Sequence, residues 1–283
     1  VEESIEHFRL AANANPALFP STLDLIWVVS DRNITYLKRI VENNQKGQLK
    51  LVLMLANQSF FPAAAEIFSK VDKETAINSW ETISFFDLLI NKGFSKLANT
   101  LWDQLKAGND TVPNNQIVWN GGFETKIESG PAQFDWKLRK SDYARISIDN
   151  SQANSGSSSL LIDFLGRDTT KLDNEVRHII SLRPGTTYRL DYYLKTEELK
   201  TNEGPRVVIS NKTGNRVAQT EPVPFGTNDW KRFSLIFTAP SKTIGDAATL
   251  FISIKRQPQY SYDPPLQGRI WFDDFSVSEV KGK

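Results

Sequence analysis

Residues 268–277 read Gly-Arg-Ile-Trp-Phe-Asp-Asp-Phe-Ser-Val. A β-strand sends successive side chains to opposite faces, so Ile270 and Phe272 would share one face and Arg269 and Trp271 the other. The purely apolar pair would lie in a core, and Arg269 and Trp271 would point outward. The stretch therefore predicts one strand of a sheet that has a single buried face.

The pattern continues past Asp273-Asp274 one position out of step, because Phe275 and Val277 return to the core face. One extra residue in a strand is a β-bulge, which we expect at Asp273-Asp274. Upstream runs with the same alternation are separated by turn residues; they are Ala144–Asp149, Ser158–Leu165, Thr187–Leu194 and Lys231–Thr238. The second part of the chain therefore predicts an antiparallel β-sandwich.

The first part of the chain has a helical period, with apolar residues recurring at spacings of three and four. An offset of 34 residues places Ala64 on Ala98 and Phe68 on Trp102, and Gly93 falls where a turn is expected. This period, with a small residue four positions before a large aromatic, is the tetratricopeptide pattern. Such arrays can dock a protein partner on a concave surface, and a plain helical spacer is the alternative.

The composition is that of an ordinary globular protein, with 40% hydrophobic residues, a net charge of +1 and no cysteine among 283 residues. This balance gives no reason to expect nucleic acid or an anionic membrane as partner. No apolar run approaches the roughly 18 residues that a membrane helix needs. The chain opens at Val1 in mid-pattern, so an upstream signal or anchor could have been removed.

We therefore predict an α + β protein whose two classes lie in separate domains. Residues 1–112 form an α-helical, tetratricopeptide-like repeat, and residues 113–283 form the antiparallel β-sandwich. The linker is expected at Pro113–Gln116.

Five stretches occur in order in the second domain: Trp119–Glu124, Phe134–Trp136, Asn154–Leu160, Ile180–Tyr188 and 268–277. In this order they resemble the jelly-roll, galactose-binding-like carbohydrate-binding modules appended to xylanases and other glycan hydrolases. The resemblance extends from Val118 to Val280. Its combination with helical repeats resembles bacterial proteins encoded near exopolysaccharide or O-antigen assembly genes.

The resemblance implies a structural calcium ion between the opening and closing strands. Glu124 and Asp273 would then be carboxylate ligands, with Asp274 as the alternative and backbone carbonyls completing the shell. Calcium takes roughly six to eight oxygen ligands, which suits such a set. The alternative is that these carboxylates cap turns or pair with Lys and Arg.

Glycan binding would use exposed aromatic rings, on which the C–H faces of sugars stack, with polar groups to bind hydroxyls. Parity places Trp271 and Tyr193 on the outward face, beside Arg189 and Arg269. Other candidate ligand residues are Trp136 in a loop, and Tyr260 and Tyr262 in a Pro-rich loop. For each tryptophan, packing is the competing interpretation, and the outer face around Trp271 could instead be an interface with the helical half.

Catalysis is disfavoured, because Asp273 and Asp274 are adjacent and would point to opposite faces. The two histidines, His7 and His178, lie in different halves, and His178 is expected at the surface of a strand. No Gly-rich phosphate loop and no nucleophile elbow occurs.

The favoured interpretation is a non-catalytic protein that binds a polysaccharide or oligosaccharide outside the cytoplasm, at a periplasmic or envelope site, while its helical repeats dock a protein partner. The alternative is a protein–protein scaffold whose sandwich binds no sugar. A third interpretation is an accessory domain of a larger enzyme.

Overall fold

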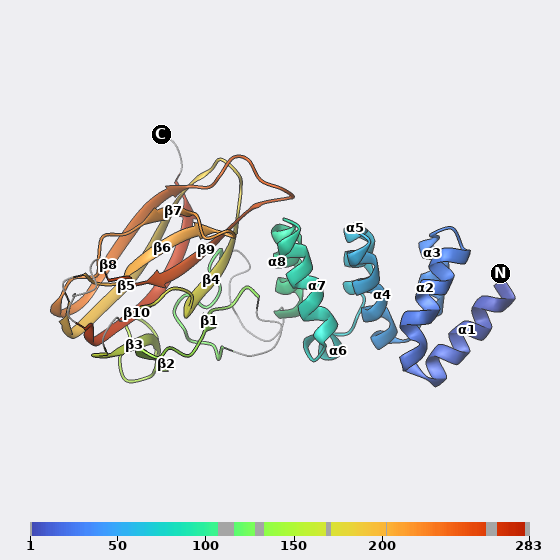
Figure 1. Cartoon of the computed structure of the whole chain (residues 1–283), viewed down its shortest axis with the longest axis horizontal. Coiled ribbons are helices and arrows are strands. Elements are labelled where there is room, and N and C mark those ends of the chain that lie inside the picture. The colour runs from blue at the N-terminus through green and yellow to red at the C-terminus, as the bar shows by residue number, and fades with distance from the viewer. Residues whose placement is uncertain are drawn as a thin grey trace. The chain divides into compact units, whose positions relative to one another are not determined.

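A computed structural model describes residues 2–106, 116–127, 133–167, 171–201, 203–258 and 265–280. The chain divides into two compact units, Val1–Thr111 and Val112–Lys283, of which the first is helical and the second is built from strands (Figure 1). The predicted linker Pro113–Gln116 lies outside the described residues except for Gln116. Among the helices that the structure describes, none combines the length and apolar character that a bilayer crossing requires.

Eight α-helices and one 3-10 helix are described in the first unit. They are α1 (Glu2–Ala14), η1 (Pro16–Leu18), α2 (Phe19–Val29), α3 (Ile34–Ile40), α4 (Gln45–Asn57), α5 (Phe61–Phe68), α6 (Lys73–Ile77), α7 (Trp80–Asn91) and α8 (Ser95–Lys106). Several helix N-termini carry side-chain caps that satisfy backbone N–H groups, such as Asn44 before α4 and Ser79 before α7.

The pairs α4–α5 and α7–α8 repeat each other along the chain. Ser59 and Gly93 follow the first helix of each pair, and both have a positive φ, 67° and 91°. The predicted turn at Gly93 is therefore present. Ala64 and Ala98 occupy equivalent places in α5 and α8, and both are fully buried. Small side chains at these two places let neighbouring helices approach closely.

The second unit is a β-sandwich of two five-stranded sheets, as the sequence predicted. The strands are β1 (Lys137–Leu138), β2 (Ala144–Asp149), β3 (Ser159–Leu165), β4 (Val176–Leu182), β5 (Thr187–Lys200), β6 (Arg206–Asn211), β7 (Arg216–Gln219), β8 (Gly226–Thr238), β9 (Ala248–Lys255) and β10 (Gln267–Glu279). The β9 sheet has the order β1-β4-β9-β6-β7, and the β10 sheet has the order β2-β3-β10-β5-β8. Every described pair is antiparallel.

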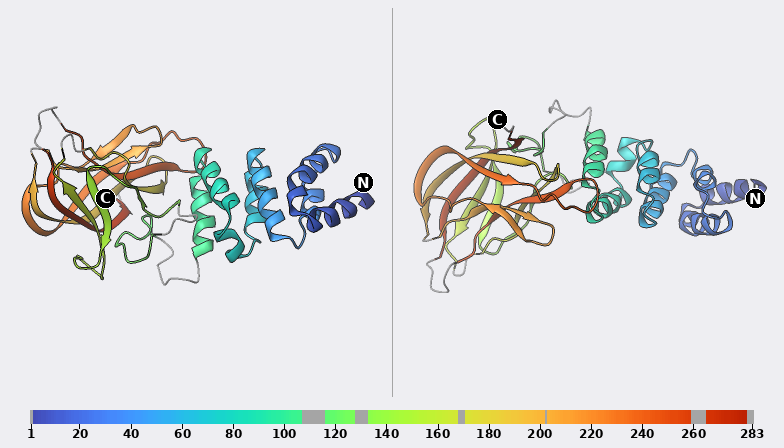
Figure 2. Two further views of the ribbon diagram at one scale, coloured as in Figure 1. Left: turned by 60° about the horizontal axis from the view of Figure 1, so that its bottom comes forward. Right: turned by 90° about the horizontal axis from the view of Figure 1, so that it is seen from above.

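The core lies between the two sheets, whose layering is visible in Figure 2. Ile252 and Ile254 of β9 face it from one side, and Ile270 and Phe272 of β10 face it from the other. Alternate residues of the same strands consequently face away from the core. Function in this unit must therefore be sought on the two outward faces or at their edges.

A bulge interrupts β10 at the predicted place. Asp273 pairs with Tyr193 and Ser276 pairs with Asp191, so Asp274 and Phe275 together oppose the single residue Tyr192. Asp274 has a φ of +52°, which marks the extra residue. The prediction of a bulge at Asp273-Asp274 is confirmed.

The bulge explains why the opening motif contains glycine. The Phe275 N–H donates to the carbonyl of Gly121 at 2.9 Å. A Cβ atom at Gly121 would lie only 2.0 Å from the carbonyl oxygen of Phe275. Gly121 is therefore required by this close approach of two backbones, which no other residue type permits.

Candidate functional site

Trp271 lies on the outward side of β10, as parity predicted, but it is not exposed. Only 2% of its surface reaches solvent, and its Nε1 donates to a carboxylate oxygen of Asp149 at 2.7 Å. The guanidinium of Arg269 lies 5.5 Å from the centre of its ring. The prediction that Trp271 offers a platform for a sugar is wrong, because neighbouring side chains already cover its ring and bind its N–H group.

Trp136 is also buried, with 1% of its surface exposed. Its ring centre lies 5.0 Å from that of Phe123 and 4.9 Å from that of Phe275. Its Nε1 donates to the carbonyl of Asn120 at 3.0 Å. Trp136 therefore belongs to the packing beneath the opening motif, and its prediction as a ligand residue is wrong.

Arg189 and Arg269 stand on the outer side of the β10 sheet and are held in ion pairs. Arg189 lies 2.8 Å from Asp191, and Arg269 lies 2.7 Å from Glu197. Tyr260 and Tyr262 lie outside the described residues. The structure therefore does not bring all of the predicted ligand residues together in one site.

Tyr193 is half-buried and lines a pocket beside the β10 bulge. The pocket has a volume of about 590 Å³, and we call it the bulge pocket. Its lining includes Gly122, Asn154, Asp191, Tyr193, Arg232 and Asp274. Of the residues predicted from the sequence, the bulge pocket therefore unites Tyr193 and Asp274.

Asp191 anchors one wall of this pocket. It accepts a hydrogen bond from the Ser234 hydroxyl and forms ion pairs with Arg189 and Arg232. Burial would raise the pKa of Asp191, but the hydrogen bonds from Ser234, Arg232 and Arg189 hold it below its usual value. Asp191 therefore stays ionised and keeps the guanidinium of Arg232 in place at 2.9 Å.

The three predicted calcium ligands gather around Gly122. A Cβ atom there would lie 3.4 Å from an Asp274 oxygen, 3.7 Å from an Asp273 oxygen and 3.8 Å from Glu124 Cγ. Burial and the neighbouring charge of Asp274 raise the pKa of Asp273 to about 6. Burial would raise the pKa of Glu124 as well, but hydrogen bonds from Ser157 and the backbone lower it.

Loop N–H and O–H donors occupy these carboxylates. Asp273 accepts from the backbone N–H of Asn154 at 2.7 Å, and Glu124 accepts from the backbone N–H groups of Ser157 and Ser158, both at 2.9 Å. Within the described residues, no group of three or more His, Cys, Asp or Glu side chains is arranged to hold a metal. As arranged, the three carboxylates hold a loop, and a calcium ion shared by two of them with backbone carbonyls stays a prediction.

His178 was expected at a strand surface, and that prediction is wrong. It is 1% exposed and packs against Trp136, with ring centres 4.9 Å apart. Its Nε2 lies 3.1 Å from the carbonyl of Trp119, to which a neutral imidazole can donate. Burial lowers the pKa of His178 to about 4, so the ring is neutral near pH 7.

The sequence interpretation overlooked the outward side of the β9 sheet, which we call the β9 face. In the register of β4, β9, β6 and β7, its residues are Arg177, Ile179, Phe251, Ser253, Lys255, Arg206, Val208, Ser210 and Gln219. Polar side chains predominate, in contrast to the apolar residues on the opposite side of the same strands, but Ile179, Val208, Ser210 and Ser253 are buried and the other five residues are only partly exposed. Parity within β9, where Leu250, Ile252 and Ile254 face the core, was the signal that could have found it.

An arginine stacked on an aromatic ring lies at the middle of the β9 face. The Arg177 guanidinium lies 3.4 Å from the ring centre of Phe251. Burial lowers the pKa of Arg177, the charge of Arg139 lowers it further, and Asp173 opposes both. Asp173 is itself ion-paired with Lys255 at 2.8 Å, and the described residues form no ion pair with Arg177.

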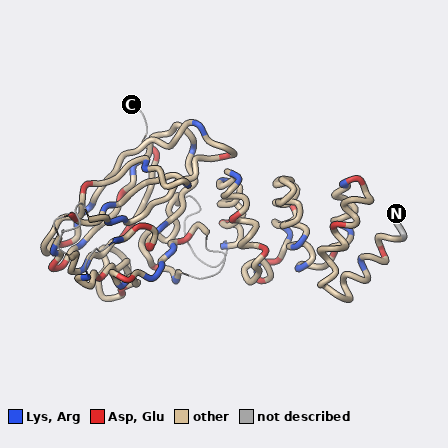
Figure 3. The backbone as a smooth tube through the Cα atoms, in the orientation of Figure 1, with Lys and Arg blue, Asp and Glu red and all other residues tan. Residues whose placement is uncertain are grey.

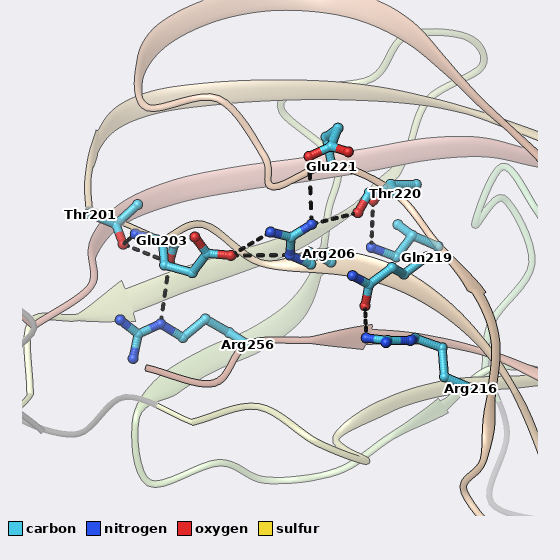
Figure 4. Close-up of polar contacts among 9 residues, drawn as sticks. Thr201, Glu203, Arg206, Arg216, Gln219, Thr220, Glu221 and Arg256 are labelled. Carbon is cyan, nitrogen blue, oxygen red and sulfur yellow. Dashed lines mark hydrogen bonds and ion pairs between the residues drawn. The ribbon is translucent and has the colours of Figure 1, made fainter. Parts of the chain in front are cut away.

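One end of the β9 face is held by a polar network (Figure 4). Arg206 donates to Glu203 at 2.7 Å and to the carbonyl of Thr220 at 3.0 Å, and lies 3.8 Å from Glu221. The Nε of Arg256 lies 3.4 Å from the Glu203 carbonyl. These contacts hold Arg206 in place at this end of the β9 face. In the chain as a whole, charges of both signs are spread along the backbone (Figure 3).

Residues 115–259, about half of the chain, match the family described as carbohydrate binding domain. The chain belongs to the carbohydrate-binding domain family. The match covers β1 to β9 of this carbohydrate-binding domain, and therefore includes the whole β9 face.

Two curated relatives also match part of the chain. The tRNA nuclease WapA of Bacillus subtilis (strain 168) is 25% identical over 185 residues, which are 62% of this chain and 7% of the relative. The tRNA(Glu)-specific nuclease WapA of Bacillus subtilis subsp. natto (strain BEST195) is 24% identical with the same coverage. The chain thus spans 7% of the length of these curated relatives, and the nuclease activity in their names is theirs.

Two solved carbohydrate-binding modules are similar to the carbohydrate-binding domain. One, described as "CBM4 structure and function", is 19% identical with a TM-score of 0.42 and covers 58% of this chain and 99% of its own. TmCBM61, solved in complex with beta-1,4-galactotriose, is 16% identical with a TM-score of 0.36 and covers 59% of this chain and 100% of its own.

Proposed function

We propose that residues 113–283 bind a glycan without cleaving it, and that the ligand lies along the β9 face. The observation that carries this proposal is the half-buried Arg177, which is stacked on Phe251 and forms no ion pair within the described residues. A desolvated guanidinium favours oxygen acceptors, which sugar hydroxyls and uronate carboxylates provide. Membership of a carbohydrate-binding family supports the same reading.

The shape of the surface favours a chain of sugars over a single ring. Neighbouring strands lie about 4.8 Å apart, so the five strands of the β9 sheet span about 19 Å. Arg177, Lys255 and Gln219 stand on three different strands across this width. An oligosaccharide crossing the strands would meet Arg177 and Gln219 on one row of the register, in which Ser253 and Val208 are buried between them, and would pass Lys255 beside that row.

Binding is preferred to hydrolysis because the acidic side chains beside the β9 face are engaged. Asp173 pairs with Lys255, and Glu203 pairs with Arg206. A glycosidase needs two carboxyl groups facing one bond, one of them as an acid. The proposed role is therefore non-catalytic.

A glycan array tests the proposal, with wild type compared with Arg177→Ala and Phe251→Ala. We expect wild type to bind at least one polysaccharide and each variant to bind it about tenfold more weakly, a loss of about 1.4 kcal/mol. Arg145→Ala is the matched control, because Arg145 is an exposed arginine on the other sheet. If Arg177→Ala binds as tightly as wild type, the site does not lie on the β9 face.

The second candidate function concerns residues 1–112, which we propose to be tetratricopeptide-like repeats that dock a protein partner. Trp80 favours it: 60% of its surface is exposed, and it lines two pockets of about 570 and 320 Å³. Lys50 and Glu81 line both pockets as well and lie 3.6 Å apart. An exposed indole beside charged groups is typical of an interface anchor.

A photo-crosslinking amino acid at position 80 tests this second function, with position 10 as control, since Leu10 is also exposed. One partner captured from position 80 and not from position 10 supports docking. If the array finds no glycan while this partner is captured, the scaffold interpretation replaces glycan binding.

The family and the domain order support a place outside the cytoplasm, at a bacterial envelope where exopolysaccharide is handled. Fractionation of cells that express the full-length protein tests this location. Recovery with the cytoplasmic fraction would contradict it.

A further inference from the structure

The bulge pocket lies on the outer side of the β10 sheet, so it belongs to the sheet opposite the β9 face. It exists because β10 departs from β5 at the bulge, where Asp274 and Phe275 oppose Tyr192 alone. The extra residue directs Asp274 into the lining, together with Tyr193 and Asp191 from β5. The pocket is therefore built by the strand geometry.

Tyr193 supplies one aromatic ring to this pocket. Its side chain is half-buried, and within the described residues its hydroxyl makes no hydrogen bond. A ring presented in this way can stack on the C–H face of a sugar, while its free hydroxyl can bind a sugar hydroxyl.

Polar groups that suit hydroxyls stand around this ring in fixed positions. Asp274 accepts from Asn154 Nδ2 at 2.7 Å and from Ser155 Oγ at 2.6 Å. A carboxylate offers about four acceptor positions, so Asp274 can accept further hydrogen bonds. On the other wall, Asp191 holds Arg232, whose guanidinium is half-exposed and can still donate. Side chains held in advance lose little entropy when a ligand binds.

We infer that the bulge pocket is a second saccharide site, which takes a short neutral sugar or the end of a neutral chain. A neutral ligand is indicated because the lining carries both signs of charge. Asp191 and Asp274 would repel an anionic sugar, and Arg232 would repel a cationic one. A short ligand is indicated because the volume of about 590 Å³ is that of a small-molecule pocket. The site is independent of the glycan proposed for the β9 face.

Titration of free D-glucose, D-galactose, D-mannose and D-xylose into the full chain, followed by NMR, tests this site. Wild type is expected to bind at least one of the four sugars. Tyr193→Ala should weaken that binding about tenfold, and Tyr193→Phe, which keeps the ring, should weaken it less than about threefold. Arg145→Ala should leave it unchanged, since Arg145 is exposed and does not line the pocket.

Two results would overturn the inference. One is that none of the four sugars binds wild type. The other is that Tyr193→Ala binds like wild type while Arg177→Ala does not, which would assign the sugar to the β9 face and leave the proposed function intact. If Tyr193→Ala fails to fold, Asp274→Asn replaces it, and unchanged binding by that variant counts against the pocket.

Discussion

The indole of Trp271 on β10 reaches over β3 to the carboxylate of Asp149 on β2, with Nε1 and Oδ2 2.7 Å apart. This bond joins two strands that are not neighbours. Trp271 therefore helps to hold β2 and β10 together in the sheet.

Replacement of Trp271 should therefore affect stability. Removing a buried tryptophan costs about 3–5 kcal/mol, so Trp271→Ala should lower the free energy of unfolding by about that amount in urea titration. Trp271→Phe keeps most of the packing and should cost less. A Trp271→Ala variant with unchanged stability and lost glycan binding would instead restore the platform interpretation.

Gly121→Ala should be strongly destabilising, by about 3 kcal/mol or more, because the new Cβ would lie 2.0 Å from the carbonyl oxygen of Phe275. Gly122→Ala is the control, since the nearest atom to its Cβ would be 3.4 Å away. Thermal unfolding of the two variants measures the difference. Equal melting temperatures would mean that the backbone separates at Gly121 without cost.

His178 should make the sandwich less stable in acid. Its pKa is about 4 when folded and 6.5 in the unfolded chain, so the unfolded state binds the extra proton between these values. Stability rises with pH across that window, by at most about 3 kcal/mol, and is lost as pH falls from about 6.5 to 4.

Asp273 opposes this trend, because its raised pKa of about 6 makes the folded state bind the proton between pH 4 and 6. The measurement is therefore the difference between wild type and His178→Gln in urea titrations at pH 7 and pH 4.5. His178→Gln should show a smaller loss of stability on acidification. Identical pH dependence in both proteins would rule out His178 as the group responsible.

Calcium should have little effect, because loop donors already occupy Glu124, Asp273 and Asp274. We expect the same melting temperature in calcium and in chelator. A rise of several degrees in calcium, absent from Glu124→Gln, would establish the site implied by the resemblance, since a ligand of the folded state raises its stability by mass action.

Local patterns were enough to predict much of the fold. Alternation marked Ala144–Asp149 with the bounds that β2 has, and the shift of parity after Phe272 predicted the bulge. Both follow from the backbone, because a strand reverses the direction of its side chains at every residue. The spacing of Ala64 and Ala98 likewise reflected two similar helix pairs.

The candidate site could not be predicted from any single segment of the sequence. Parity correctly placed Trp271 on the outward side, yet its burial depends on Asp149, which is remote in sequence. The β9 face draws on four strands whose order, β4-β9-β6-β7, arises from pairing between distant segments. The sequence by itself determined which residues of a strand share a face, because alternation is a property of one strand, although it was misapplied at His178. Only the tertiary structure decided which outward residues stay exposed and which meet in one site, because that depends on what other strands and loops place over them.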